Sequence, residues 1–102
     1  MRSKITHYQL SQEADIDLDE IFEYTEKAHG FNQAVEYLNA LEILFNTLVL
    51  NPEIGRKRPE IKRGLYSISE QSRSVFYRIM ETCIRIVRVL HGQKEIPKHF
   101  KK

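Results

Sequence analysis

The sequence predicts an α+β fold in which an antiparallel helical hairpin packs on one face of a mostly antiparallel sheet. The first half of the 102-residue chain carries apolar residues at helical spacing, whereas the second half alternates apolar and polar residues with a period of two. The link between the two expected helices is one or two residues long, which favours a hairpin. Because each layer is amphipathic, each needs the other as an apolar partner. Residues 1–102 are expected to form one domain.

The first expected elements are a strand over Lys4–Leu10 and a helix that follows it. Branched and aromatic residues favour the strand. Ser11 is a suitable N-cap for the helix, and acidic residues in its first turns complement the positive end of the helix dipole. Gly30 predicts the end of this helix, because glycine is common just past a helix C-terminus.

A second helix is expected over Gln33–Leu50, with Asn32 as its N-cap. Pro52 ends it, since the residue before a proline is driven away from helical geometry. A basic loop follows over Gly55–Gly64, in which five of ten residues are Lys or Arg.

Three strands are expected next, over Leu65–Ser69, Ser74–Met80 and Cys83–Leu90, joined by short polar turns as in a meander. The predicted order is therefore β-α-α-β-β-β, with a C-terminal tail at residues 91–102. Both faces of the last strand are largely apolar, but two helices can cover only one of them. We therefore expect the second face to be a surface for a partner.

Alternation along the last strand decides which charged side chains could act together. It places Arg88 on one face, and Arg85 with His91 on the other. Arg85 and His91 are six residues apart, which is about 20 Å at the rise of a strand. We therefore expect that these side chains do not grip one phosphate together.

Charge is distributed unevenly along the chain. Residues 1–54 contain three Lys/Arg and ten Asp/Glu, a net charge of −7, whereas residues 55–102 contain thirteen and four, a net charge of +9. A field of this kind steers partners, so the basic half favours a polyanion or an acidic protein surface.

Composition argues against several classes of protein. The single cysteine, Cys83, excludes an internal disulfide and a cysteine-based zinc site, and the four histidines lack metal-ligand spacing. The four glycines are too scattered for a phosphate-binding loop. No apolar run approaches the ~18 residues that span a bilayer, and the N-terminus lacks the apolar region of a signal peptide. These observations predict a cytoplasmic protein without metal or cofactor.

With these elements assigned, the chain resembles the RelE/ParE superfamily of bacterial toxin–antitoxin toxins. The resemblance rests on the element order and on three segments: "LNPEIGRKRPEIKRGLYSI" (residues 50–68), "VFYRI" (75–79) and "IRIVRVLHGQKEIPKHF" (84–100). Within the superfamily, "RVLHG" followed by a charged stretch and "IP" is most similar to the ParE branch.

The resemblance to ParE implies a toxin that binds DNA gyrase, stabilises its cleaved-DNA state and has no catalytic residues of its own. It also implies a cognate antitoxin whose acidic, amphipathic C-terminal segment neutralises the toxin. The candidate partner-binding residues are basic or titratable side chains of the loop, the sheet and the tail: Arg56, Lys57, Arg58, Lys62, Arg63, Arg78, Arg85, His91, Lys94 and Lys98.

Two alternatives remain open at this stage. The RelE branch cleaves mRNA on the ribosome, a reaction that needs an acid–base group and cations around the phosphate. His91, Arg63 and Arg85 are the candidates for those roles. The other alternative is a basic nucleic-acid-binding module, although the basic loop lacks the interleaved aromatic residues typical of such modules.

Overall fold

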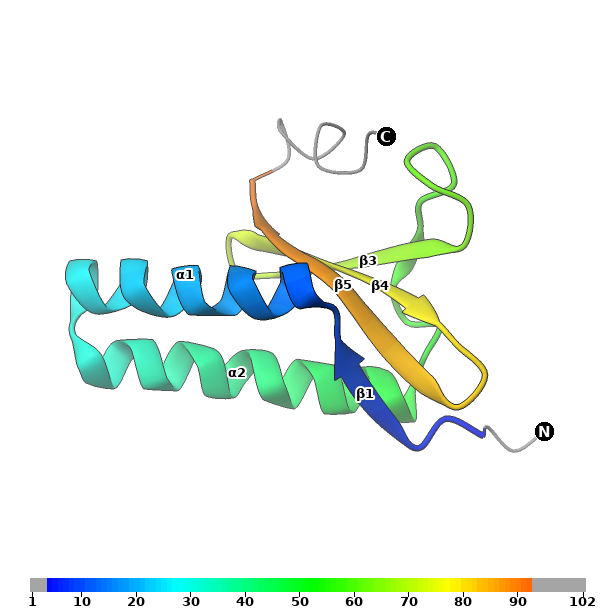
Figure 1. Cartoon of the computed structure of the whole chain (residues 1–102), viewed down its shortest axis with the longest axis horizontal. Helices are drawn as coiled ribbons and strands as arrows, with labels where there is room; N and C mark the ends of the chain where they lie inside the picture. Colours follow the sequence, from blue (N-terminus) through cyan, green and yellow to red (C-terminus); the bar gives the residue numbers. More distant parts are fainter. Residues whose placement is uncertain (1–3, 93–102) are drawn as a thin grey trace.

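The computed structural model describes residues 4–92 as a helical hairpin packed on a mixed sheet (Figure 1). The strand order is β1-β5-β4-β3-β2, in which β1 runs parallel to β5 and every other pair is antiparallel. The elements in chain order are β1 (His7–Leu10), α1 (Gln12–His29), α2 (Phe31–Leu50), β2 (Arg56–Lys57), β3 (Leu65–Glu70), β4 (Arg73–Ile79) and β5 (Cys83–His91).

This architecture confirms the predicted α+β fold and adds one strand to it. The added strand, β2, lies inside the predicted basic loop and is only two residues long. It pairs with β3, so the loop begins as the edge of the sheet and not as a free turn. Most of the predicted C-terminal tail, residues 93–102, lies outside the described residues.

Single residues define the ends of the helices. The Ser11 hydroxyl accepts a hydrogen bond from the N–H of Ala14 at 2.9 Å, which confirms Ser11 as the N-cap of α1. Gly30 alone separates the helices, with a φ of 97° that favours glycine. The expected N-cap at Asn32 is wrong, because α2 already begins at Phe31.

The main core lies between the hairpin and one face of the sheet. Tyr8 of β1 packs against Phe45 of α2 with ring centroids 5.2 Å apart, which ties the edge strand to the hairpin. Burial of this apolar area is the main stabilising contribution to the fold. The buried residues of this core are Ala14, Ile21, Leu41, Phe45, Leu48, Val75, Tyr77, Ile84, Ile86 and Val89.

Tyr77 anchors the segment that follows α2. Its hydroxyl donates to the carbonyl oxygen of Pro52 at 2.7 Å and accepts from the N–H of Gly55 at 3.0 Å. Burial raises the pKa of this hydroxyl above its ordinary value, so it remains a neutral donor at physiological pH. Because β2 begins directly after Gly55, this anchor fixes the place where the basic loop starts.

A β-bulge in β5 changes which side chains share a face. Phe76 pairs with Arg88 but the next residue, Tyr77, pairs with Ile86, so Val87 is the extra residue of β5. The strict alternation predicted for this strand is therefore wrong beyond Ile86. Val89 joins Ile86 in the main core, and His91 faces the side of the sheet opposite to Arg85.

The N-terminal turns of α1 replace β1 at the edge of β5 where the bulge lies. The Ser11 hydroxyl donates to the carbonyl oxygen of Val87 at 2.8 Å. Further along, the Asp17 carboxylate accepts from the backbone N–H of Val89 and from two nitrogens of Arg88, each at 2.9 Å. The bonds to the carbonyl of Val87 and the N–H of Val89 satisfy backbone groups that β1, which ends at Leu10, no longer reaches.

The face of the sheet turned away from the helices is less apolar and less open than expected. Leu65, Phe76 and Leu90 form a second buried cluster there, against which Ile61 and Val87 pack. The loop between β2 and β3 thus covers the centre of this face from within the chain. What remains accessible around the cluster is mainly polar and basic.

Candidate functional site

We define the basic sheet face as the side of the sheet that lies opposite the helices. Residues paired across neighbouring strands project to the same side, so the sheet register decides which side chains meet there. Arg56 of β2 pairs with Ser67 of β3, and Ser67 pairs with Phe76 of β4. Arg78 of β4 pairs with Arg85 of β5. The register therefore brings three of the predicted binding arginines to one face.

Arg58 is held in place on this face by contacts on three sides. Its Nη1 donates to the Ser67 hydroxyl at 2.9 Å, and its Nε donates to the Glu60 carboxylate at 2.6 Å. The guanidinium carbon lies 5.9 Å from the ring centroid of Phe76, within the range of a cation–π contact. The Arg58 side chain is only 14% exposed, and its guanidinium lowers the pKa of Glu60 below the ordinary value.

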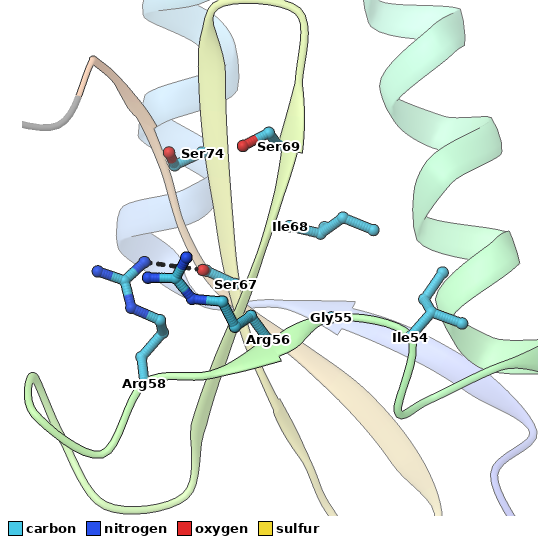
Figure 2. Close-up of a pocket in the computed structure, with 8 residues that line it drawn as sticks. All are labelled: Ile54, Gly55, Arg56, Arg58, Ser67, Ile68, Ser69 and Ser74. Carbon is cyan, nitrogen blue, oxygen red and sulfur yellow. Dashed lines mark hydrogen bonds between the residues drawn. The ribbon is translucent and has the colours of Figure 1, made fainter.

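A polar cavity of about 240 Å³ lies between the start of β2 and the strand β3. Figure 2 shows the guanidinium groups of Arg56 and Arg58 beside Ser67, and the Ser69 and Ser74 side chains further along the strands. Two cationic groups and three hydroxyls therefore line one small space. Ile54, Gly55 and Ile68 complete its wall.

Arg78 and Arg85 form a second basic group on the same face. A Cβ atom on Gly64 would lie 3.3 Å from Nη2 of Arg78, so the end of the loop packs directly against this guanidinium. Arg85 is exposed, as are the loop residues Lys62 and Arg63. The two basic groups occupy neighbouring parts of one sheet face and extend its positive field across several strands.

The structure does not bring the remaining candidates to this face. Lys57 alternates with Arg56 along β2 and pairs with Tyr66, a residue that packs against the main core, so it projects to the helix side. His91 pairs with Arg73 at the far end of β5 from Arg85, also on the helix side. Lys94 and Lys98 lie outside the described residues.

The positions of His91 and Arg85 bear on the RelE-type alternative. The bulge at Val87 places these two side chains on opposite sides of the sheet, where unbroken alternation predicts one shared side. Their partners on β4, Arg78 and Arg73, are five residues apart, so His91 and Arg85 are still separated by about 17 Å along the sheet. His91, Arg63 and Arg85 are therefore not assembled around one point in the described residues.

The sequence prediction missed the polar row on β3 and β4 that completes the cavity. Ser67 and Ser69 alternate with apolar residues in "LYSIS", and Ser74 opens the next strand. Ser67 and Ser74 are buried, which is unusual for serine. Both belong to the polar wall of the cavity. A polar residue at every second position of a strand is the signal that could have identified this row.

Within residues 4–92 no cluster of three or more His, Cys, Asp or Glu side chains could hold a metal ion. No helix there is both long and apolar enough to cross a membrane.

The protein is thus a small α+β domain with a positively charged face on its sheet. A family model described as "ParE toxin of type II toxin-antitoxin system, parDE" matches residues 8–96. The chain belongs to this family of ParE toxins, which confirms the resemblance drawn from the sequence.

Curated relatives agree with this assignment. Toxin ParE1 of Mycobacterium tuberculosis is 36% identical over 96 residues, which cover 93% of this chain and 98% of the relative. Toxin ParE1 of Caulobacter vibrioides is 32% identical over 93 residues, covering 91% and 96% respectively.

A solved structure with a similar fold is titled "Chromosomal ParDE TA system from P. aeruginosa". It superposes with a TM-score of 0.76 at 19% identity and covers 89% of this chain and 100% of that chain. At this level of identity the similarity supports the fold. Membership of a toxin–antitoxin family implies an antitoxin as the partner of this toxin.

Proposed function

We propose that this ParE toxin acts in the cytoplasm by binding DNA gyrase and stabilising its cleaved-DNA state. Membership of the ParE family over residues 8–96 carries this proposal. The separation of His91 from Arg85 supports inhibition by binding over cleavage of RNA, because acid–base catalysis requires the groups to reach the same reacting atoms. On this proposal the domain, residues 1–102, contributes surfaces and no catalytic group.

The basic sheet face is our candidate for the docking of partners. Arg56, Arg58, Arg78 and Arg85 share this face, whereas α1 carries acidic residues in its first turn. We propose that the acidic, amphipathic segment of the antitoxin binds here, since opposite potentials guide two surfaces together. The exposed loop residues Lys62 and Arg63, and Lys94 and Lys98 beyond the described residues, are proposed to extend the contact.

The target is tested by two assays on the purified toxin. We expect inhibition of gyrase supercoiling with accumulation of cleaved DNA, and no cutting of mRNA on translating ribosomes. The His91→Ala variant should retain gyrase inhibition within about twofold, because an exposed side chain away from the basic face contributes little to binding there. Cut mRNA with unaffected gyrase, lost in His91→Ala, would instead establish the RelE-type activity.

Association with the antitoxin should depend strongly on salt. We expect the association rate constant to fall by about tenfold or more between low and physiological ionic strength, because screening weakens long-range steering by the basic face. Stopped-flow mixing of toxin and antitoxin over a salt series measures this. A rate that stays constant over the series would exclude the basic face as the docking surface.

A further inference from the structure

The cavity beside β3 has the properties of a site for one small anion. Its volume of about 240 Å³ lies below the range of roughly 300–1,000 Å³ that encloses a drug-sized ligand. Two guanidinium groups and three hydroxyls line it, and among residues 4–92 no carboxylate belongs to its lining. A cavity this small and this rich in donors suits a single charged group better than a whole ligand.

We propose that this cavity binds one phosphate group, carried by a nucleotide or by a nucleic-acid strand. A guanidinium donates to two phosphate oxygens at once, and a second guanidinium with nearby hydroxyls reaches the others. Arg58 and Arg56 supply the guanidinium groups, and Ser69 is the exposed hydroxyl among the lining serines. A planar carboxylate has two oxygens and would leave part of this donor set unpaired.

Arg58 is already oriented for this role before any ligand arrives. Its bond to Ser67 and its contact with the Phe76 ring fix the guanidinium, so little side-chain freedom is lost on binding. Glu60 occupies the Nε edge of the same guanidinium, but its own side chain is 58% exposed and it does not line the cavity. From outside the cavity, the Glu60 charge partly neutralises Arg58 and so weakens its attraction for an incoming phosphate.

The edge of β3 adds to the donor set. β2 pairs only with Tyr66 and Ser67, so between residues 4 and 92 no strand pairs with the outer edge of residues 68–70. An unpaired strand edge presents backbone N–H groups as well as carbonyl oxygens. Ser69, which lines the cavity, presents its backbone groups at this edge, because they point to the same side as the Leu65 carbonyl that accepts from the Arg58 N–H.

The test is a titration of the isotopically labelled full chain with inorganic phosphate at constant ionic strength and pH. We expect the amide resonances of Ser67 and Ser69 to shift with saturation. The exposed Arg56→Gln should weaken the apparent affinity about tenfold, as expected for loss of a charge-assisted contact. Lys57→Gln is the matched control, because it removes the same charge from the neighbouring position on the other side of β2. It should change the affinity by less than about twofold.

Glu60→Gln tests the effect of the Glu60 charge directly. Removal of this charge should raise the phosphate affinity by about threefold, as for an exposed ion pair of modest strength. Thymidine monophosphate and a short oligothymidylate distinguish the two sources: tighter binding of the first indicates a nucleotide, and tighter binding of the second indicates a nucleic-acid strand.

Three outcomes would overturn the proposal. The first is equal weakening by Arg56→Gln and Lys57→Gln, which would show only a general charge effect. The second is acetate, or a polyglutamate peptide, binding at these residues as tightly as phosphate. The third is the absence of saturable shifts at Ser67 and Ser69. None of these readouts involves gyrase or an antitoxin, so this proposal and the proposed function fail independently.

Discussion

Asp17→Ala is expected to destabilise the fold by about 3 kcal/mol, a large share of the roughly 5–15 kcal/mol that stabilises a domain. The Asp17 carboxylate is 8% exposed and accepts three hydrogen bonds, from Arg88 and from the backbone of Val89. Its removal leaves the guanidinium, itself only 19% exposed, without its counter-charge, and leaves a buried N–H without an acceptor. Urea unfolding followed by circular dichroism measures the loss.

Asp19→Ala is the matched control, because Asp19 lies on the same helix and is exposed. It should change the free energy of unfolding by no more than about 0.5 kcal/mol. Combining Asp17→Ala with Arg88→Ala should cost less than the sum of the two single changes, since the second removes the charge that the first leaves unpaired. Additive losses, or a loss below about 1 kcal/mol for Asp17→Ala, would contradict this account of the edge of β5.

Gly55→Ala is expected to destabilise the fold by a similar amount, about 3 kcal/mol, through a steric conflict. A Cβ atom at Gly55 would lie 2.5 Å from the Tyr77 hydroxyl oxygen and 2.9 Å from the carbonyl oxygen of Ser67. Both neighbours are fixed, the first by its hydrogen bond to Pro52 and the second by the sheet. The substitution therefore separates the start of β2 from β3, and hydrogen exchange of the β2–β3 amides should accelerate.

Tyr77→Phe separates the steric part from the hydrogen-bonding part. Alone, it removes two hydrogen bonds and should cost about 1–3 kcal/mol. In the double variant with Gly55→Ala, the hydroxyl that the added Cβ atom would strike is absent, so the combined loss should be smaller than the sum. If the two losses add fully, the conflict lies with the Ser67 carbonyl oxygen or with Cε1 of the Tyr77 ring, each 2.9 Å from the added Cβ atom, and not with the Tyr77 hydroxyl.

The layers of the fold were predictable, but the exact pairing in β5 was not. Helical spacing and period-two alternation are local properties, so the hairpin and the three long strands followed from them. The bulge at Val87 has a different origin. It lies where β1 ends and Ser11 turns the chain into α1, so it depends on contacts across 76 positions of sequence. No local pattern encodes such a contact.

The candidate site was predicted in its charge and not in its geometry. The basic loop was visible as a run of Lys and Arg, but the pairing of a two-residue strand decides that Arg56 and Lys57 face opposite sides. His91 lies on the helix side and not on the predicted side, because one extra residue in β5 reverses the side to which every later side chain projects. The alternating serines of β3 were visible in the sequence. They indicate a site only in combination with Arg56 and Arg58, which the sheet register places beside them.

The central place of β5 also constrains the order in which the toxin becomes folded as it is made. β1 leaves the ribosome first, but the strand with which it pairs between residues 4 and 92 is β5, whose first paired residue, Cys83, is translated 76 residues after His7. β4 likewise has β5 as its second neighbour in the described sheet, after β3. Until Cys83–His91 emerges, the helices lack three of the core residues that cover their apolar side, Ile84, Ile86 and Val89. A nascent chain that stops before β5 therefore lacks the central strand of the sheet. It cannot form the complete basic sheet face that we propose as the docking surface.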